Sequence, residues 1–266
     1  MHRLPIVTLP LLAVLLAATA LAPRPASAAE CKYTAPRNMQ LDLAGVQSVR
    51  VEVHSHDLHL RGGAGTGLTV AGRACASDQA ALADLTVTQR REGNQLLLDL
   101  GNNRSGSVFN LFGSSYAYLD VTVQLPANLP VTLSVGSGDA DVTGVRQLQA
   151  QVGSGDLHVR NIAERFTVSV GSGDINANDV GTLEVGAVGS GDFNATGVRG
   201  DVRVGSVGSG DVRLRQVGGN VHAETIGSGD LAVDGVAGDF SLGAKGSGDV
   251  THTGVKGKVS VPHDDD

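Results

Sequence analysis

Apolar and polar residues alternate along most of the chain after residue 40. From residue 136 one unit recurs: Gly-Ser-Gly-Asp, an arm with apolar residues at its first, third and sixth positions, a short turn, and a second alternating arm. The inward positions of one such unit are Ile175, Ala177, Val180, Leu183, Val185 and Val188. Alternation of branched residues is typical of a strand with one buried face. Each unit therefore predicts two short strands and has no room for a helix.

The Gly-Ser-Gly-Asp motif begins at residues 136, 153, 171, 189, 208, 227 and 246, in steps of 17 to 19 residues. A fixed period of this length indicates repeats that stack on one another. Parallel coils stack about 4.8 Å apart, so equivalent residues form ladders. Parallel crossovers are almost always right-handed. We therefore predict an all-β fold, a right-handed parallel β-solenoid (β-helix), with one short helix near its N-terminal end.

The motif has the chemistry of a tight turn. Two glycines allow close approach of neighbouring coils, and the serine and aspartate can bond to nearby backbone N–H groups. We expect the aspartates to form a structural ladder, capped by backbone N–H groups and without an obligatory metal. The ladder consists of Asp139, Asp156, Asp174, Asp192, Asp211, Asp230 and Asp249.

The opposite corner of each repeat has the looser pattern x-Gly-x. It includes Arg199-Gly200-Asp201, which has the sequence of an integrin-binding tripeptide. Three other repeats place x-Gly-x at the same corner, so turn chemistry explains this tripeptide.

The first 28 residues have the features of a secretory signal peptide. Arg3 gives a charged start, residues 9–21 are apolar, and Ala26-Ser27-Ala28 is a small-residue cleavage site. No later stretch is predicted to span a membrane. Without Arg3 and Arg24, the basic residues fall from 20 to 18 against 27 acidic ones, a formal charge of −9. This charge opposes binding to nucleic acid or to an anionic membrane.

The chain has two cysteines, Cys31 and Cys75. Glu30 precedes Cys31, which argues against a lipoprotein anchor, because such a signal needs a small residue there. An even count in an exported chain predicts a disulfide, and two free thiols are the alternative.

Residues 55–60 resemble residues 154–159 and predict an early, degenerate coil of the solenoid. His54, His56 and His59 cluster there and can be considered as metal ligands. No cysteine or carboxylate cluster completes the set in the sequence, so polar groups on an outer face and a turn are favoured.

Residues 77–85 predict one short helix with Ser77 as N-cap, covering the N-terminal end of the solenoid. A hairpin through Glu92-Gly93-Asn94 is predicted to follow.

Residues 101–118 form a Gly/Asn/Ser-rich loop with a concentration of aromatic residues. Two interpretations are open: a partner-contact surface or, preferred, a lid over the solenoid edge. The candidate contact residues are Phe109, Phe112, Tyr116 and Tyr118.

The run LDVTVQLPANLPVTLSVGSGDADVTGV at residues 119–145, with the Gly-Ser-Gly-Asp repeats, resembles a widespread group of exported bacterial β-strand-repeat proteins. These are the head GIN-type auto-transporter adhesin domain and its relatives of unknown function. The resemblance covers residues 40–262. It implies a β-helix and an adhesin-like role, and it brings no catalytic residues with it.

Four parts are predicted: a signal peptide (1–28), a β-rich start of the solenoid with the helix and aromatic loop (29–135), the regular solenoid (136–262) and an acidic tail (263–266). We expect a periplasmic or cell-surface protein that is not an enzyme, needs no cofactor, and binds a protein or envelope polymer. The alternatives are a structural spacer or polymer-forming protein and, less favoured, a polysaccharide-active enzyme. Such an enzyme needs non-repeating carboxylates and aromatic platforms.

Overall fold

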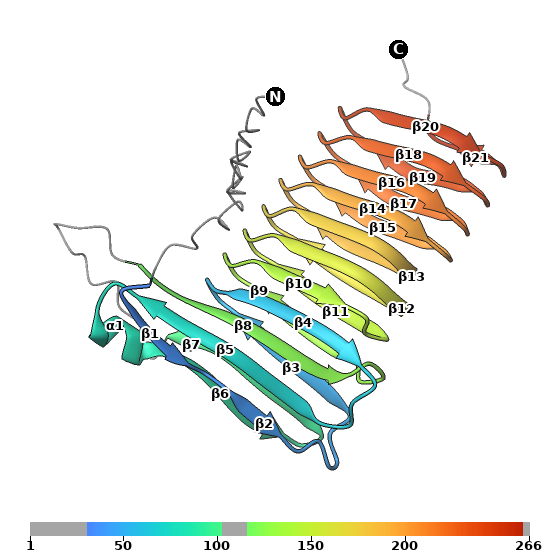
Figure 1. The fold of residues 1–266 in the computed structure, drawn as a ribbon. Coiled ribbons are helices and arrows are strands. Elements are labelled where there is room, and N and C mark those ends of the chain that lie inside the picture. The colour runs from blue at the N-terminus through green and yellow to red at the C-terminus, as the bar shows by residue number, and fades with distance from the viewer. Residues whose placement is uncertain (1–30, 103–115, 263–266) are drawn as a thin grey trace, which may run out of the picture. The chain divides into compact units, whose positions relative to one another are not determined.

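The structure is a computed structural model, and it describes residues 31–102 and 116–262 (Figure 1). Its N-terminal strands are β1 (Tyr33–Pro36), β2 (Met39–Leu41), β3 (Ser48–Val53), β4 (Asp57–Gly63), β5 (Leu68–Ala76), β6 (Leu85–Glu92), β7 (Gln95–Asn102) and β8 (Ala117–Pro126). The later strands are β9 (Val131–Val135), β10 (Ala140–Thr143), β11 (Gln147–Val152), β12 (Leu157–Val170), β13 (Ile175–Val188), β14 (Phe193–Val198), β15 (Val202–Val207), β16 (Val212–Val217), β17 (Val221–Ile226), β18 (Leu231–Val236), β19 (Phe240–Lys245), β20 (Val250–Val255) and β21 (Val259–Ser260).

Each strand of the repeat region pairs in parallel with the equivalent strand of the next repeat. One ladder of paired residues runs through Leu157, Ile175, Phe193, Val212 and Leu231. A ladder of the second arm runs through Leu183, Val202, Val221 and Phe240. All of these side chains are buried, and burying a side chain of this kind contributes about 1.5–3 kcal/mol. The predicted all-β parallel solenoid is confirmed, while its right-handed sense stays a prediction.

A left-handed residue explains the uneven spacing of the first arm. Each coil from β10 onward has one residue with positive φ just before the third apolar position, and this extra residue turns that position back toward the core. Gly144, Asn161, Asp179, Gly197, Gln216, Gly235 and Gly254 occupy this place, with φ between 55° and 75°. Glycine, asparagine and aspartate tolerate this conformation best.

The first coils do not stack in the order of the sequence. The coil made of β3 and β4 is the predicted early coil, since Leu58 pairs with Ala140 as Ala140 pairs with Leu157. However, β3 lies between β7 and β9, and β4 lies between β8 and β10 (Figure 1). The chain thus leaves this coil, forms β5 to β8 on one side, and returns to its other side with β9.

Antiparallel strands cover the N-terminal end of the stack. β5 pairs antiparallel with β8, β1 and β2 pair with β5, and β6 pairs with β7 through the predicted hairpin. The predicted hairpin is thus one of several antiparallel pairings at this end.

The helix α1 (Gln79–Asp84) packs against β1, β5 and β6. Its N-cap is Asp78, whose carboxylate accepts the N–H of Ala81 at 2.8 Å. The prediction of Ser77 as N-cap was wrong, because the Asp78 side chain makes the capping bond and the Ser77 hydroxyl accepts the N–H of Tyr116 at 3.3 Å instead. Within the described part of the chain α1 is the only helix, and its six residues are far too few for a membrane span.

Candidate functional site

The Gly-Ser-Gly-Asp corners form a continuous ladder of hydrogen bonds. The backbone N–H of each aspartate donates to Oδ1 of the aspartate one coil earlier, from Asp156 bonding to Asp139 through Asp249 bonding to Asp230, at 2.9 to 3.3 Å. Arg213 lies beside two of these carboxylates, 2.8 Å from Asp211 and 3.4 Å from Asp192. Nearby backbone N–H groups and Arg213 therefore stabilise the negative charge of the aspartate carboxylates.

Asp57 occupies the aspartate position in the coil of β3 and β4. Burial raises the pKa of Asp57 above its ordinary value of 3.8, and the negative charges of Asp139 and Asp120 raise it further. His59 and His56 act in the opposite direction. Proton binding by this carboxyl is therefore favoured in the folded state.

The opposite corner is held by the same type of hydrogen bond between neighbouring coils. The N–H groups of Asn220, Asp239 and Lys258 each donate to the side-chain oxygen one coil earlier, at 2.7 to 2.8 Å. Asp201 of the Arg-Gly-Asp tripeptide is the first acceptor in this row, and Arg199 bonds to Asp179 and to backbone carbonyls. Both charged side chains of the tripeptide therefore form hydrogen bonds with neighbouring coils of the same protein.

The two cysteines form a disulfide close to the predicted aromatic loop. Cys31 and Cys75 are bonded, with their Cα atoms 5.5 Å apart. The hydroxyl of Tyr118 lies 3.6 Å from Sγ of Cys31, and the hydroxyl of Tyr116 accepts the N–H of Lys32. Both tyrosines therefore contact the N-terminal segment.

Phe109 and Phe112 lie outside the described residues. The role proposed for the aromatic loop as a partner-contact surface stays a prediction.

The three clustered histidines diverge, so they do not form the joint site considered from the sequence. His56 is buried and its Nδ1 accepts the N–H of Leu119 at 3.3 Å. His59 lies on the outer face of β4, with Nδ1 at 3.1 Å from Asp141. His54 lies at the end of β3, with Nε2 at 3.2 Å from Oδ1 of Asp99.

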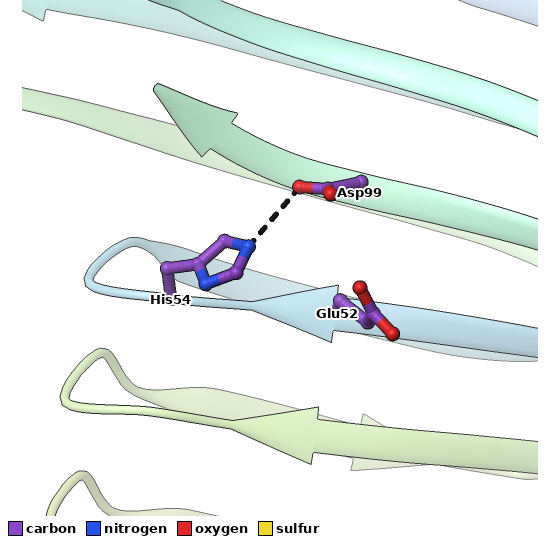
Figure 2. Close-up of side chains that lie close together, drawn as sticks. All are labelled: Glu52, His54 and Asp99. Atoms are coloured by element: carbon purple, nitrogen blue, oxygen red, sulfur yellow. Dashed lines mark hydrogen bonds and ion pairs between the residues drawn. The ribbon is translucent and has the colours of Figure 1, made fainter. Parts of the chain in front are cut away.

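His54 has carboxylate neighbours that sequence reasoning missed. Figure 2 shows Glu52 and Asp99 on neighbouring strands beside the imidazole. The expectation that no carboxylates join these histidines was wrong for His54. Asp99 is 45 residues away in sequence, and only the pairing of β3 with β7 brings it there.

A second cluster forms a shallow hollow on the outer face of β4, β10 and β12, which we name the basic hollow. It has a volume of about 270 Å³. Its polar lining consists of His59, Arg61, Asp141, Thr143, His158 and Arg160. These residues form two rows, because Asp141 pairs with His59 and His158, while Thr143 pairs with Arg61 and Arg160.

The basic hollow results from side-chain size. Thr143 is short and lies between two long arginines, so the surface between the guanidinium groups is left open. Neither Arg61 nor Arg160 has an ion-pair partner within residues 31–102 and 116–262. By contrast, Arg146 and Arg213 bond to nearby carboxylates. The hollow therefore presents two cationic groups that remain available to a ligand.

A family model described as Toastrack DUF4097 matches residues 46–263. The match supports the resemblance to β-strand-repeat proteins and identifies the Toastrack family, while the more specific resemblance to the head GIN-type domain stays a prediction. No curated protein matches the chain.

Similar solved structures include a "putative lipid binding protein" from Parabacteroides distasonis, 15% identical with a TM-score of 0.45 over 84% of this chain and 96% of that one. A "putative adhesin" from Bacteroides fragilis is 16% identical with a TM-score of 0.41, over 87% and 98% of the two chains. A "putative cell adhesion protein" from Clostridium sporogenes is 12% identical with a TM-score of 0.33, over 85% and 99%. At these sequence identities and TM-scores, the similarity is not evidence for the function of this chain.

Proposed function

The chain belongs to the Toastrack DUF4097 family, and we propose that it is an exported, non-enzymatic, adhesin-like protein that binds an acidic polymer of the cell envelope. The basic hollow is the proposed contact site. The disulfide supports export, because disulfides persist mainly in oxidising compartments. The signal-peptide pattern of residues 1–28 points the same way.

The two unpaired arginines of the hollow carry this proposal. Guanidinium groups bind carboxylates and phosphates through paired N–H donors. Arg61 and Arg160 lie two coils apart, so their backbones are separated by about 9.6 Å. An acidic group of a polymer can enter the gap over Thr143 and accept hydrogen bonds from one or both sides. His59, His158 and the Thr143 hydroxyl add further polar contacts for sugar hydroxyls.

The charge of the chain makes the hollow selective. The sequence is acidic, with 27 acidic against 20 basic residues. A polyanion is repelled by most of such a surface and is attracted only where positive charge is locally in excess. Binding should therefore be local, weak per site and sensitive to salt.

We do not propose a catalytic role, because the residues that line the hollow do not suit glycoside hydrolysis. Glycoside hydrolysis generally needs two carboxyl groups about 5–9.5 Å apart across the bond that is cleaved. Asp141 is the one carboxylate that lines the hollow, and it bonds to His59. The lining has no tyrosine, phenylalanine or tryptophan on which a sugar ring can stack.

A binding assay with defined polymers tests the proposal. Purified protein is passed over immobilised polyuronate and over neutral dextran at low ionic strength. We expect retention on the polyuronate alone, and a loss of affinity of at least about tenfold in the Arg61→Ala, Arg160→Ala double variant, since charged hydrogen bonds contribute about 1.5–3 kcal/mol each.

Arg203→Ala is the matched control. Arg203 lies on the outer face of the other arm, on β15, beside Glu184. Its removal should leave retention unchanged. Equal retention of the wild type and the double variant, or equal retention on dextran, contradicts the proposal.

A further inference from the structure

The parallel pairing of β3 with β7 places three potential metal ligands on one outer face. Glu52 pairs directly with Asp99. His54 follows Glu52 by two residues and lies directly after the end of β3. Figure 2 shows the imidazole directed toward Asp99, with Glu52 to one side of it on β3. One nitrogen and two carboxylates thus come together from two segments of the chain.

The distances suit a single ion. One ligand atom from each residue lies within 4.8 Å of the other two, and His54 Nε2 is 3.2 Å from Asp99 Oδ1. In a tetrahedral site with bonds of about 2.0–2.2 Å, ligand atoms lie roughly 3.4 Å apart. The histidine and aspartate already have this spacing. Glu52 has a ligand oxygen within 4.8 Å of the other two ligand atoms, and rotation of its flexible side chain can bring this oxygen to the same spacing.

Gly101 keeps the space beside the imidazole and the Asp99 carboxylate open. Gly101 follows Leu100, the partner of Val53, and lies beside His54 in the stack. A Cβ atom at Gly101 would lie 2.7 Å from Asp99 Oδ1 and 3.5 Å from His54 Cδ2. Any larger residue at Gly101 would fill the space above the aspartate, and the side chain of His54 remains 59% exposed to an incoming ion.

The charge of the cluster favours a cation. Carboxylates that lie directly opposite each other on paired strands repel, and Glu52 and Asp99 are such a pair. Arg50 neutralises part of this charge through a contact of 3.0 Å with Glu52. In the next coil the row continues with Ser134, so the paired negative charge is confined to this place.

We propose that Glu52, His54 and Asp99 bind a divalent first-row transition-metal ion of the Zn²⁺ type. Imidazole is a ligand for zinc and its neighbours in the series, whereas Ca²⁺ and Mg²⁺ prefer sites made of oxygen alone. Three protein ligands leave one position of a tetrahedral ion for water or for an atom of a partner. This site is separate from the basic hollow and does not depend on the function proposed for it.

Calorimetric titration of the purified, chelator-treated protein with Zn²⁺ tests the site. We expect one site with an affinity at least tenfold above that of any other, and no comparable heat with Ca²⁺ or Mg²⁺. His54→Ala and Asp99→Asn should each weaken it by at least about tenfold, since the loss of even an outer-shell group costs about 10–100-fold in metal affinity. Glu52→Gln should weaken it as well. Metal-free melting curves establish that each variant is folded.

His222→Ala is the matched control. His222 also lies on the outer face of a strand, β17, but its Nδ1 bonds to the Ser241 hydroxyl at 2.8 Å. It should bind Zn²⁺ with wild-type affinity, and so should the Arg61→Ala, Arg160→Ala double variant. Unchanged affinity in His54→Ala overturns the proposal, as does a loss that appears in His59→Ala instead.

Discussion

Replacing the second glycine of a central corner by alanine tests how closely the coils stack. A Cβ atom at Gly191 would lie 1.9 Å from the carbonyl oxygen of Gly173 in the preceding coil. Non-bonded carbon and oxygen atoms need about 3 Å, so the two backbones must separate by more than about 1 Å. Backbone atoms have no rotamer by which to avoid this contact. Gly191→Ala therefore forces the corner of one coil away from the next.

The cost follows from the hydrogen bonds that hold the corner. The N–H groups of Gly189 and Ser190 donate to the carbonyls of Val170 and Gly171 in the preceding coil at 2.9 and 2.8 Å, and the N–H of Asp192 donates to Asp174 at 2.9 Å. An added 1 Å takes such bonds beyond hydrogen-bonding distance. Each bond contributes about 1 kcal/mol, and forcing an extra atom into a close-packed contact costs about 1–3 kcal/mol. We expect a loss of about 3–5 kcal/mol, a large share of the 5–15 kcal/mol typical of a domain.

Thermal and urea melting by circular dichroism measure this loss. At about 2–4 °C per kcal/mol for a chain of this size, the melting temperature should fall by roughly 10 °C or more. Amide hydrogen exchange should rise first at Gly189 and Ser190, because repeat stacks open locally.

Gly65→Ala is the control, since a Cβ atom there meets nothing within 4 Å. It should change stability by less than about 1 kcal/mol. Equal melting of Gly191→Ala and the wild type would refute the close stacking of the corners.

Further predictions concern the core, the disulfide and two aspartates. Val204→Asp buries an unpaired charge at a position 1% exposed, so soluble folded protein should be lost in expression assays, and near-wild-type melting would contradict this. Reduction of the Cys31–Cys75 bond, which spans 44 residues, should lower the stability measured in urea by about 4 kcal/mol in the chain-entropy model; no change in the urea midpoint would argue against it. The pKa of Asp57 is raised by burial and by neighbouring carboxylates, so ionisation of this carboxyl lowers the stability of the folded protein as pH rises through and above 3.8. Asp57→Asn should therefore melt at a higher temperature than the wild type at pH 7 and at the same temperature at pH 3. A lower melting temperature of Asp57→Asn at pH 7 would show that the carboxylate stabilises the fold. Asp192→Asn keeps an oxygen that accepts the next N–H, so its melting temperature should stay within a few degrees of wild type and, like that of the wild type, should not differ between Ca²⁺ and chelator; a Ca²⁺-dependent rise confined to the wild type would identify the ladder as a metal site.

The regular part of the fold is predictable because every local signal in it has the same period. Inward residues such as Phe193 and Val212 recur at fixed distances from the motif, and each pairs with its equivalent in the next coil. A shift of one residue would turn the whole inward row outward. The alternation therefore fixes which residues are buried and how the coils pair.

The order of the first coils is not predictable from the same pattern. Alternating residues identify β3, β4, β7 and β8 as strands, but they do not specify which edge of one coil receives the next. Right-handed parallel crossovers and short connections favour stacking in sequence order. Here β9 pairs with β3 rather than with β7, because the long excursion through β5 to β8 occupies the other edge of β3.

The two candidate sites also differ in how far the sequence predicts them. Asp141 and His158 lie one repeat apart, so the register predicts their pairing. Glu52 and Asp99 do not share a repeat pattern, and their contact depends on the pairing of β3 with β7. The clustering of histidines in the sequence therefore did not predict the metal ligands correctly. The strand alternation and the turn place His54, His56 and His59 in three different surroundings.

The irregular coil and the candidate chemistry coincide for a steric reason. A regular corner requires the second glycine of the motif, at its third position, because each such residue faces a backbone carbonyl of the coil before it. A Cβ atom at Gly155 would lie 1.7 Å from the carbonyl oxygen of Gly138. His56 occupies this position in the coil of β3 and β4. It can do so because the segment it faces is not a Gly-Ser-Gly-Asp corner, and the backbone N–H of Leu119 bonds to its ring. His54 likewise replaces the first glycine of the motif. Departure from the repeat is thus what allows titratable and metal-binding side chains at a corner, and both proposed sites include residues of this one coil.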